Sequence, residues 1–322
     1  VGPGDVDWYG VATRQGAELR DLRRDLCAGD PDAVHARLYD GRLPFSQKAN
    51  ALCDWVSFPL DAPRIAAQEV GVAALIVDLL DLRCFAWSAP QPGLGELIEA
   101  LRKRWPDHAW LRVLATRRGL LCGSDGSLQR IAKLESSEAW MLRGLAALMA
   151  GDLKLSTKMY AKGVAALRSD HGRRDVILRR PEEVLLLLAY LLEGSPTRLK
   201  QARRLLDSSL QNEQRQLGLY TSGYSGACCQ LDRLLGLLTL GTAEPSAPPS
   251  SPLACLVAGL VDWWGGEEPD QKSLDAAISR CEATGCGWLA AELRALRHGD
   301  PKHALPGHTA LIEHRQRTPA WE

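Results

Sequence analysis

The chain has 322 residues, of which 46% are hydrophobic, and its 39 basic side chains balance its 39 acidic ones. This length accommodates one large helical array or two to three domains, and the zero net charge excludes an attraction of the whole chain to nucleic acid. Leucine, alanine and arginine are abundant, whereas phenylalanine occurs three times. Such a composition favours helices over strands.

Helices are predicted along the chain up to residue 121. Apolar residues at three- and four-residue spacing indicate amphipathic helices, and Asp30 followed by Pro31 is typical of a helix start. The apolar centre of the helix at 61–82 indicates that this helix is buried. The predicted ranges are 11–28, 32–39, 46–56, 61–82, 94–105 and 107–121.

Two consecutive helix–turn–helix units are predicted between residues 137 and 211. The first occupies 137–168 with its elbow at Gly151-Asp152, and the second occupies 181–211 with its elbow at 194–196. A polar, arginine-rich loop at 169–180 joins them. Such a unit cannot bury its apolar face alone, so we expect both units to stack on neighbours.

The helical pattern weakens after residue 211 and then resumes. Residues 220–226 predict either a loop or a helix interrupted by glycines, and 228–240 predict an apolar helix. The segment 242–252 is too rich in proline and serine to be helical, so it is predicted to be a linker.

Three further helices are predicted after this linker. Their ranges are 253–264, 271–283 and 287–298. We therefore predict a main helical-repeat domain at 1–241, a linker at 242–252 and a small C-terminal helical segment at 253–322.

Large and small residues alternate in the first unit in a way that resembles the tetratricopeptide repeat. With Ser137 as position one, Trp140 is at four, Gly144 at eight, Tyr160 at twenty-four and Gly163 at twenty-seven. Small side chains let helix axes approach and large ones fill the remaining space. The second unit keeps this order but not the spacing. We predict an all-α, tetratricopeptide-like helix–turn–helix array, either an irregular α-solenoid or a helical bundle, and two ordinary amphipathic hairpins are the alternative.

The same segment resembles a helical region upstream of the motor in bacterial Swi/Snf-type helicases. The positions that carry the resemblance are Gly151-Asp152, Tyr160, Leu167-Arg168, 172–174 and 194–196, and the pattern departs from the family at 179–181. The resemblance covers about a fifth of the chain. It implies an accessory region of a nucleic-acid translocase, with the ATPase lobes beyond Glu322.

The sequence contains no familiar catalytic or metal-binding motif. It has no phosphate loop and no dinucleotide fingerprint. The segment 223–226 is one residue short of a nucleophile elbow, and neither Cys228-Cys229 nor the pair Cys281 and Cys286 completes a zinc frame. We therefore expect no catalytic residue, no metal and no small-molecule cofactor.

Two groups of basic residues are candidates for phosphate contact. One group surrounds the arginine-rich loop, and the other lies on the second helix of the second unit. If stacking brings them to one edge, they form a rim that contacts phosphates, whereas the alternative is a solvated face with internal ion pairs. The predicted contact residues are Arg168, Arg173, Arg174, Arg179, Arg180, Arg198, Lys200, Arg203 and Arg204. A further group allows the same two interpretations: Arg102, Lys103, Arg104, Arg112, Arg117 and Arg118.

Nine scattered cysteines, an odd number without paired spacing, predict reduced thiols and a cytoplasmic location. The N-terminal sequence lacks the features of a secretory signal, and the apolar run at 70–80 is too short to cross a membrane. The chain ends predict a piece of a longer protein. We expect a non-catalytic scaffold, an accessory part of a Swi/Snf-type helicase that contacts DNA, the motor or a protein partner. The alternative is a stand-alone protein-interaction adaptor without a nucleic-acid role.

Overall fold

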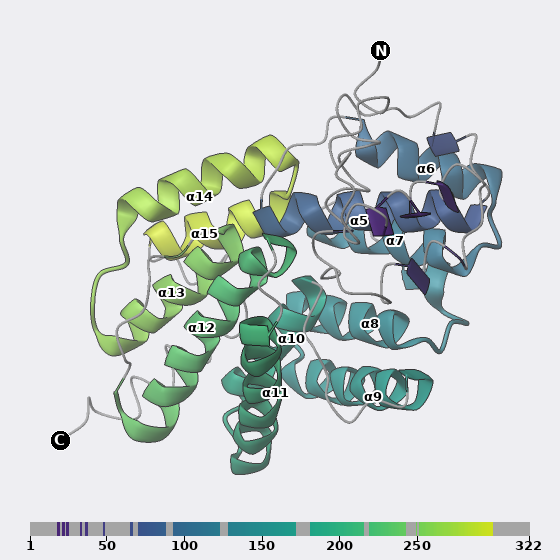
Figure 1. The fold of residues 1–322 in the computed structure, drawn as a ribbon. Helices are drawn as coiled ribbons and strands as arrows, with labels where there is room; N and C mark the ends of the chain where they lie inside the picture. The colour runs from purple at the N-terminus through teal and green to yellow at the C-terminus, as the bar shows by residue number, and fades with distance from the viewer. Residues whose placement is uncertain are drawn as a thin grey trace.

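The computed structural model describes residues 70–87, 93–122, 128–171, 181–215, 219–242, 249 and 251–298, together with single residues between 18 and 66. Within these ranges the chain forms eleven α-helices and no strand (Figure 1), which confirms the predicted all-α class. Whether the helices form a tetratricopeptide-like array stays a prediction.

The helices follow one another with short connections. Their bounds are α5 Val70–Trp87, α6 Leu94–Arg104, α7 Ala109–Leu121, the 3-10 turn η1 Leu128–Ile131, α8 Ser137–Met149, α9 Leu153–His171, α10 Pro181–Glu193, α11 Pro196–Arg215, α12 Leu219–Leu240, α13 Pro252–Gly265, α14 Gln271–Thr284 and α15 Gly287–His298.

Several predicted elements are confirmed and two boundaries differ. The helices predicted at 253–264, 271–283 and 287–298 are α13, α14 and α15. The loop predicted at 220–226 is wrong, because α12 continues through Gly223 and Gly226, as the alternative prediction of a glycine-interrupted helix required. The predicted loop at 169–180 also begins later, because α9 continues to His171.

Local chemistry explains where helices begin and end. The Ser136 hydroxyl accepts a hydrogen bond from a backbone N–H in the first turn of α8, and Ser251 does the same for α13. Pro252 follows as the first residue of α13, where the missing N–H costs no hydrogen bond. Helix α13 ends at Gly266, whose φ of 88° lies in the left-handed region that glycine adopts readily.

Both predicted helix–turn–helix units are present. Helix α8 packs on α9, and α10 packs on α11. The elbows contain Gly151 with a φ of 91° and Gly194 with a φ of 69°, values that a residue with a side chain adopts only with strain.

Small residues lie where α8 crosses its neighbours. A Cβ atom added at Gly163 on α9 would lie 2.8 Å from Met141 Cγ and 3.1 Å from the Ser137 carbonyl oxygen, both on α8. A Cβ at Gly144 would lie 3.2 Å from Leu186 Cδ2 on α10. The two glycines therefore allow α8, α9 and α10 to approach closely.

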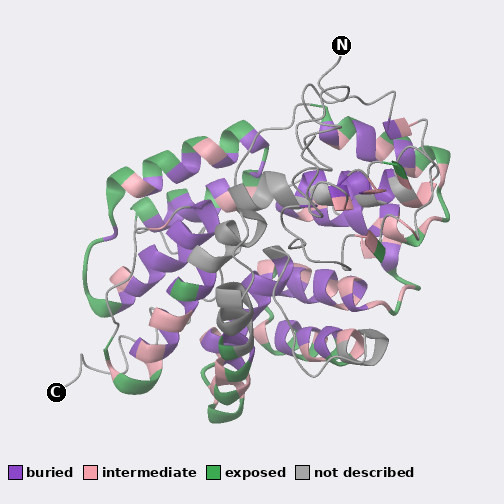
Figure 2. Ribbon diagram, in the orientation of Figure 1, coloured by how far each residue is buried: buried purple, intermediate pink, exposed green. Residues whose placement is uncertain are grey.

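Buried side chains form two clusters that both include residues of α7. Figure 2 colours the buried residues of the described helices purple. The larger cluster draws on helices from α7 to α15 and includes Val113 and Leu121 of α7. The smaller one draws on α5, α6 and α7 and includes Leu111 and Leu114. Helix α7 therefore contributes buried residues to both clusters.

Helices that are far apart in the sequence are in contact. Helix α5 contacts α10 and α12, and α12 packs against α13 across the segment predicted as a linker (Figure 1). The Cys286 thiol, at the start of α15, donates a hydrogen bond to the Leu121 carbonyl at the end of α7, at 3.4 Å. The last described helix therefore packs against α7, more than 150 residues earlier in the chain.

Candidate functional site

The arginine-rich loop lies outside the residues that the structure describes. This applies to Arg173, Arg174, Arg179 and Arg180. The backbone of Arg168 belongs to α9, but its side chain is outside the description as well. The five arginines of the first predicted group therefore stay predictions.

Two of the four predicted basic residues on α11 are engaged inside the molecule. The Arg198 Nε atom lies 3.2 Å from a Glu193 carboxylate oxygen, and its guanidinium lies 4.9 Å from the centre of the Tyr190 ring. Arg203 pairs with Asp232 of α12 at 2.5 Å. These contacts hold α11 against α10 and α12, so both charges are largely balanced.

The other two predicted residues on α11, Lys200 and Arg204, are exposed. No carboxylate of the described residues lies within 4.0 Å of either charged group. They are four residues apart, or about 6 Å along the helix axis. Together they form a small unpaired basic surface at the place where the sequence predicts phosphate contact.

The second predicted basic group is mostly built into the fold. Arg102 pairs with Glu99 at 2.8 Å, and Arg104 and Arg112 each donate to a backbone carbonyl. Lys103 is exposed. The remaining two members, Arg117 and Arg118, belong to a buried network.

Arg117 is fully buried and joins three helices. From α7, its Nη1 atom lies 2.8 Å from Asp78 Oδ1 and 3.5 Å from Asp81 Oδ2, both on α5. Its Nε atom lies 3.1 Å from Glu182 Oε1 on α10. Arg118 Nη1 pairs with Asp81 Oδ1 at 2.8 Å. A buried guanidinium with several carboxylates is therefore the connection between α5, α7 and α10.

Burial and ion pairing shift the pKa values of the groups in this network in opposite directions. Burial raises the pKa of Asp81, although Arg118 and Arg117 act to lower it. Burial acts to lower the pKa of Arg117, but Glu182, Asp78 and Asp81 outweigh it, and the pKa is raised. Arg117 Nη2 and Glu182 Oε2 make no hydrogen bond among the described residues. Among the described residues, the ion pairs of this network connect α7 with α5 and α10.

Sequence reasoning treated Arg117 as part of a surface group. The sequence signal that was missed lies in the acidic residues that pair with Arg117. Asp78 interrupts the apolar run of α5, and Glu182 precedes the apolar run of α10. A carboxylate inside an apolar stretch requires a buried cation, because an unpaired buried charge is strongly unfavourable.

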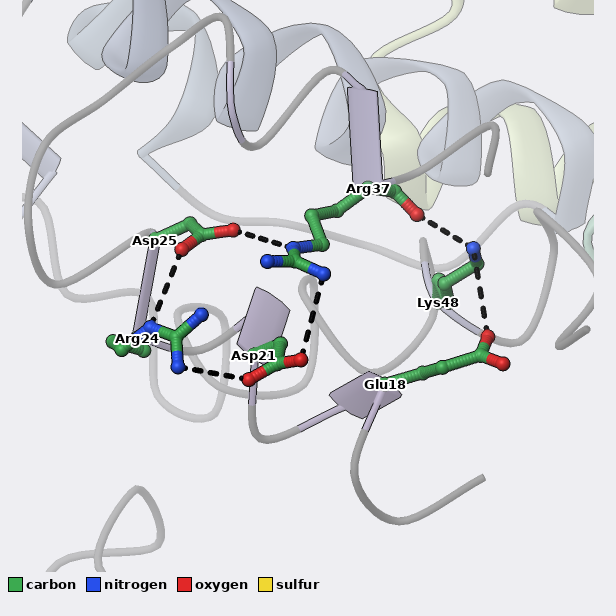
Figure 3. Close-up of polar contacts among 6 residues, drawn as sticks. All are labelled: Glu18, Asp21, Arg24, Asp25, Arg37 and Lys48. Carbon is green, nitrogen blue, oxygen red and sulfur yellow. Dashed lines mark hydrogen bonds and ion pairs between the residues drawn. The ribbon is translucent and has the colours of Figure 1, made fainter. Parts of the chain in front are cut away.

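A second set of ion pairs lies near the N-terminus (Figure 3). Arg37 Nε lies 2.7 Å from Asp25 Oδ2, and Arg24 Nη1 lies 2.9 Å from Asp21 Oδ1. The buried Lys48 ammonium donates to the Arg37 carbonyl at 2.5 Å. Every charged group in Figure 3 thus contacts another group in the set, and the cluster joins segments around residues 18–25, 37 and 48.

The described cysteines are free thiols: Cys122, Cys228, Cys229, Cys255, Cys281 and Cys286. A hydrogen bond with Cys281, together with burial, raises the pKa of Cys286 well above its usual range. Burial also raises the pKa of Cys122, to about 11. Among the described residues, no three His, Cys, Asp or Glu side chains are arranged to hold a metal ion.

None of the helices in the described ranges is long and apolar enough to cross a lipid bilayer. Comparisons with protein-family models, with curated proteins and with solved structures each found no match.

Proposed function

We propose that this chain is a non-catalytic helical scaffold, and that it is an accessory region of a Swi/Snf-type helicase or translocase that contacts DNA. The observation that carries the proposal is the pair Lys200 and Arg204, which are exposed and unpaired on α11. They lie within the segment whose sequence resembles the accessory region of these motors. Cations that the fold does not use are available for phosphates.

The use of buried charge supports a scaffold. Arg117 is paired with carboxylates from two other helices, and its contacts fix how α5, α7 and α10 sit relative to one another. A scaffold must hold its surface residues in constant positions, and interhelical pairs of this kind do so. Phosphate contacts from such a surface give affinity without sequence recognition.

The test is binding of a short fluorescein-labelled DNA duplex to the intact chain, measured by fluorescence anisotropy at about 50 mM salt. We expect salt-dependent binding that weakens several-fold in the double variant Lys200→Gln, Arg204→Gln. Replacing the loop residues Arg173, Arg174, Arg179 and Arg180 with alanine is expected to weaken it several-fold as well. Absence of binding by the parent chain would contradict the proposal and leave the adaptor alternative.

A further inference from the structure

Helix α9 exposes a row of three lysines. Lys154, Lys158 and Lys162 occupy successive turns of one helix face, and all three are exposed. The helix carries no acidic residue between Leu153 and Leu167. No carboxylate of the described residues lies within 4.0 Å of any of the three ammonium groups. The row is therefore an unpaired strip of positive charge, which we call the α9 lysine row.

The end of the row is fixed by an aromatic side chain of α8. The Lys162 ammonium lies 4.3 Å from the centre of the Trp140 ring, and the Arg143 guanidinium lies 4.4 Å from the same centre. Arg143 also donates to the Ile131 and Leu134 carbonyls, at 2.7 and 2.8 Å. These contacts hold two cations in defined positions against one ring.

The positive charge of this face comes from the row itself, because its surroundings carry two cations against three carboxylates. Between residues 131 and 167 there are five cations, Lys133, Arg143 and the three lysines of the row, against three carboxylates. The carboxylates are Glu135, Glu138 and Asp152. Asp152 is used as the cap of α9, where it accepts from the Leu155 N–H at 2.8 Å.

Like charges on successive turns repel each other, so the row is most favourable when an anion lies along it. We infer that the α9 lysine row binds the phosphate backbone of a nucleic-acid strand. The charges repeat about every 6 Å along the helix, and a nucleic-acid strand is a polyanion with a regular repeat of charge. This inference rests on the proposed function and extends it to a surface that the sequence prediction did not include.

The shape of this face favours a nucleic acid over an acidic protein segment. Ala165 lies within the exposed arc and Ala161 at its edge, so short side chains lie between the lysines. Leu155 is the one large apolar side chain exposed on α9 among the described residues, whereas protein partners are usually anchored by several buried apolar side chains. Phosphate contact needs only charge at the correct spacing.

The row and the basic pair on α11 lie at the same end of the molecule. Helix α10 contacts both α9 and α11, and Figure 1 shows these helices at the end opposite α14. The α9 lysine row and the pair Lys200 and Arg204 are on different helices. Variants of the pair can therefore be compared with variants of the row.

The experiment compares three double variants that each remove two positive charges. Lys154→Gln with Lys158→Gln removes two of the three lysines of the row and leaves Lys162 on its Trp140 contact. Lys200→Gln with Arg204→Gln removes the pair on α11. Lys272→Gln with Arg297→Gln removes two exposed positive charges, on α14 and α15, outside both predicted basic groups and is the matched control. Circular dichroism verifies that each variant is folded, and anisotropy of the labelled duplex gives Kd.

We expect the row variant to raise Kd on the order of tenfold at about 50 mM salt, and the control to change it less than about twofold. Equal changes in the row variant and the control would overturn the inference and leave the proposed function standing. No duplex binding by the parent would overturn both. Binding of polyglutamate that is tighter than duplex binding, and equally dependent on the row, would overturn nucleic acid as the partner.

Discussion

At the scale of single residues, Arg117 explains how the scaffold tolerates charge in its interior. The guanidinium and the Glu182 carboxylate are fully buried, and Asp78 is nearly so. Removing ions from water carries a large free-energy penalty, and pairing offsets it only when the geometry is good. Three helices meet at this residue, so its loss removes the buried cation that pairs with carboxylates on two of them.

Replacing Arg117 with methionine is therefore expected to lower the free energy of unfolding by about 3–5 kcal/mol, because the buried carboxylates lose this cation. Urea unfolding followed by circular dichroism measures this loss. The control is Arg102→Ala, whose partner Glu99 is partly exposed, and a change below about 1 kcal/mol is expected there. A similar small change in both variants would show that Arg117 is not essential to the interior.

Cys122 makes a prediction about reactivity. Burial raises the pKa of this thiol to about 11, and the thiolate is the reactive form. Alkylation by iodoacetamide at pH 8.5 is expected to be on the order of a hundredfold slower than for free cysteine, and its rate should keep rising as pH approaches 11. Mass spectrometry of the peptide containing Cys122 follows the reaction. A rate that levels off above about pH 9 would contradict the raised pKa.

At the scale of helices, the pair α8–α9 depends on close approach at Gly163. Because an added Cβ would lie 2.8 Å from Met141 Cγ and 3.1 Å from the Ser137 carbonyl, even alanine requires a shift of packed atoms. The cost of such overpacking is typically larger than the gain in helix propensity from replacing glycine.

We expect Gly163→Ala to lower the free energy of unfolding by about 1–2 kcal/mol, the net of overpacking and helix propensity. The matched control is Gly265→Ala near the end of α13, where nothing lies within 4 Å of the added Cβ. That variant should be neutral or more stable by up to about 1 kcal/mol. Thermal unfolding compares the two, and a Gly163→Ala protein as stable as the control would refute the close approach.

The helices were largely predictable because their signals are local. Gly151 and Gly194 mark the elbows, and Ser136 and Ser251 mark helix starts. The role of Arg117 was not predictable from the sequence, because its partners lie 39 and 65 residues away along the chain. Nothing in a basic cluster distinguishes an exposed arginine from one paired with a distant helix.

The candidate site also contains features that the sequence could predict and features that it could not. Of the predicted residues on α11, Arg198 and Arg203 pair with neighbouring carboxylates, while Lys200 and Arg204 have no carboxylate partner among the described residues. Whether a basic side chain on α11 is paired depends on the residues that the fold brings next to it. The α9 lysine row could have been found, because three lysines at four-residue spacing without an acidic neighbour are visible in the sequence.

At the scale of the whole molecule, the buried clusters and the basic surfaces are connected through helices that contact one another. The two buried clusters meet on α7, and the Arg117 contacts connect α7 to α5 and α10. Helix α10 in turn contacts α9 and α11, which carry the unpaired cations. The interior thereby fixes the positions from which the proposed phosphate contacts are made.

The salt dependence of duplex binding tests this account most directly. Each phosphate contact contributes about 0.9 to the slope of log K against log salt, so Lys154→Gln with Lys158→Gln should reduce the magnitude of the slope by about 1.8. The control Lys272→Gln with Arg297→Gln should leave the slope unchanged. If the row variant retained the slope of the parent, or if the parent bound duplex with no salt dependence, the central claim would be contradicted.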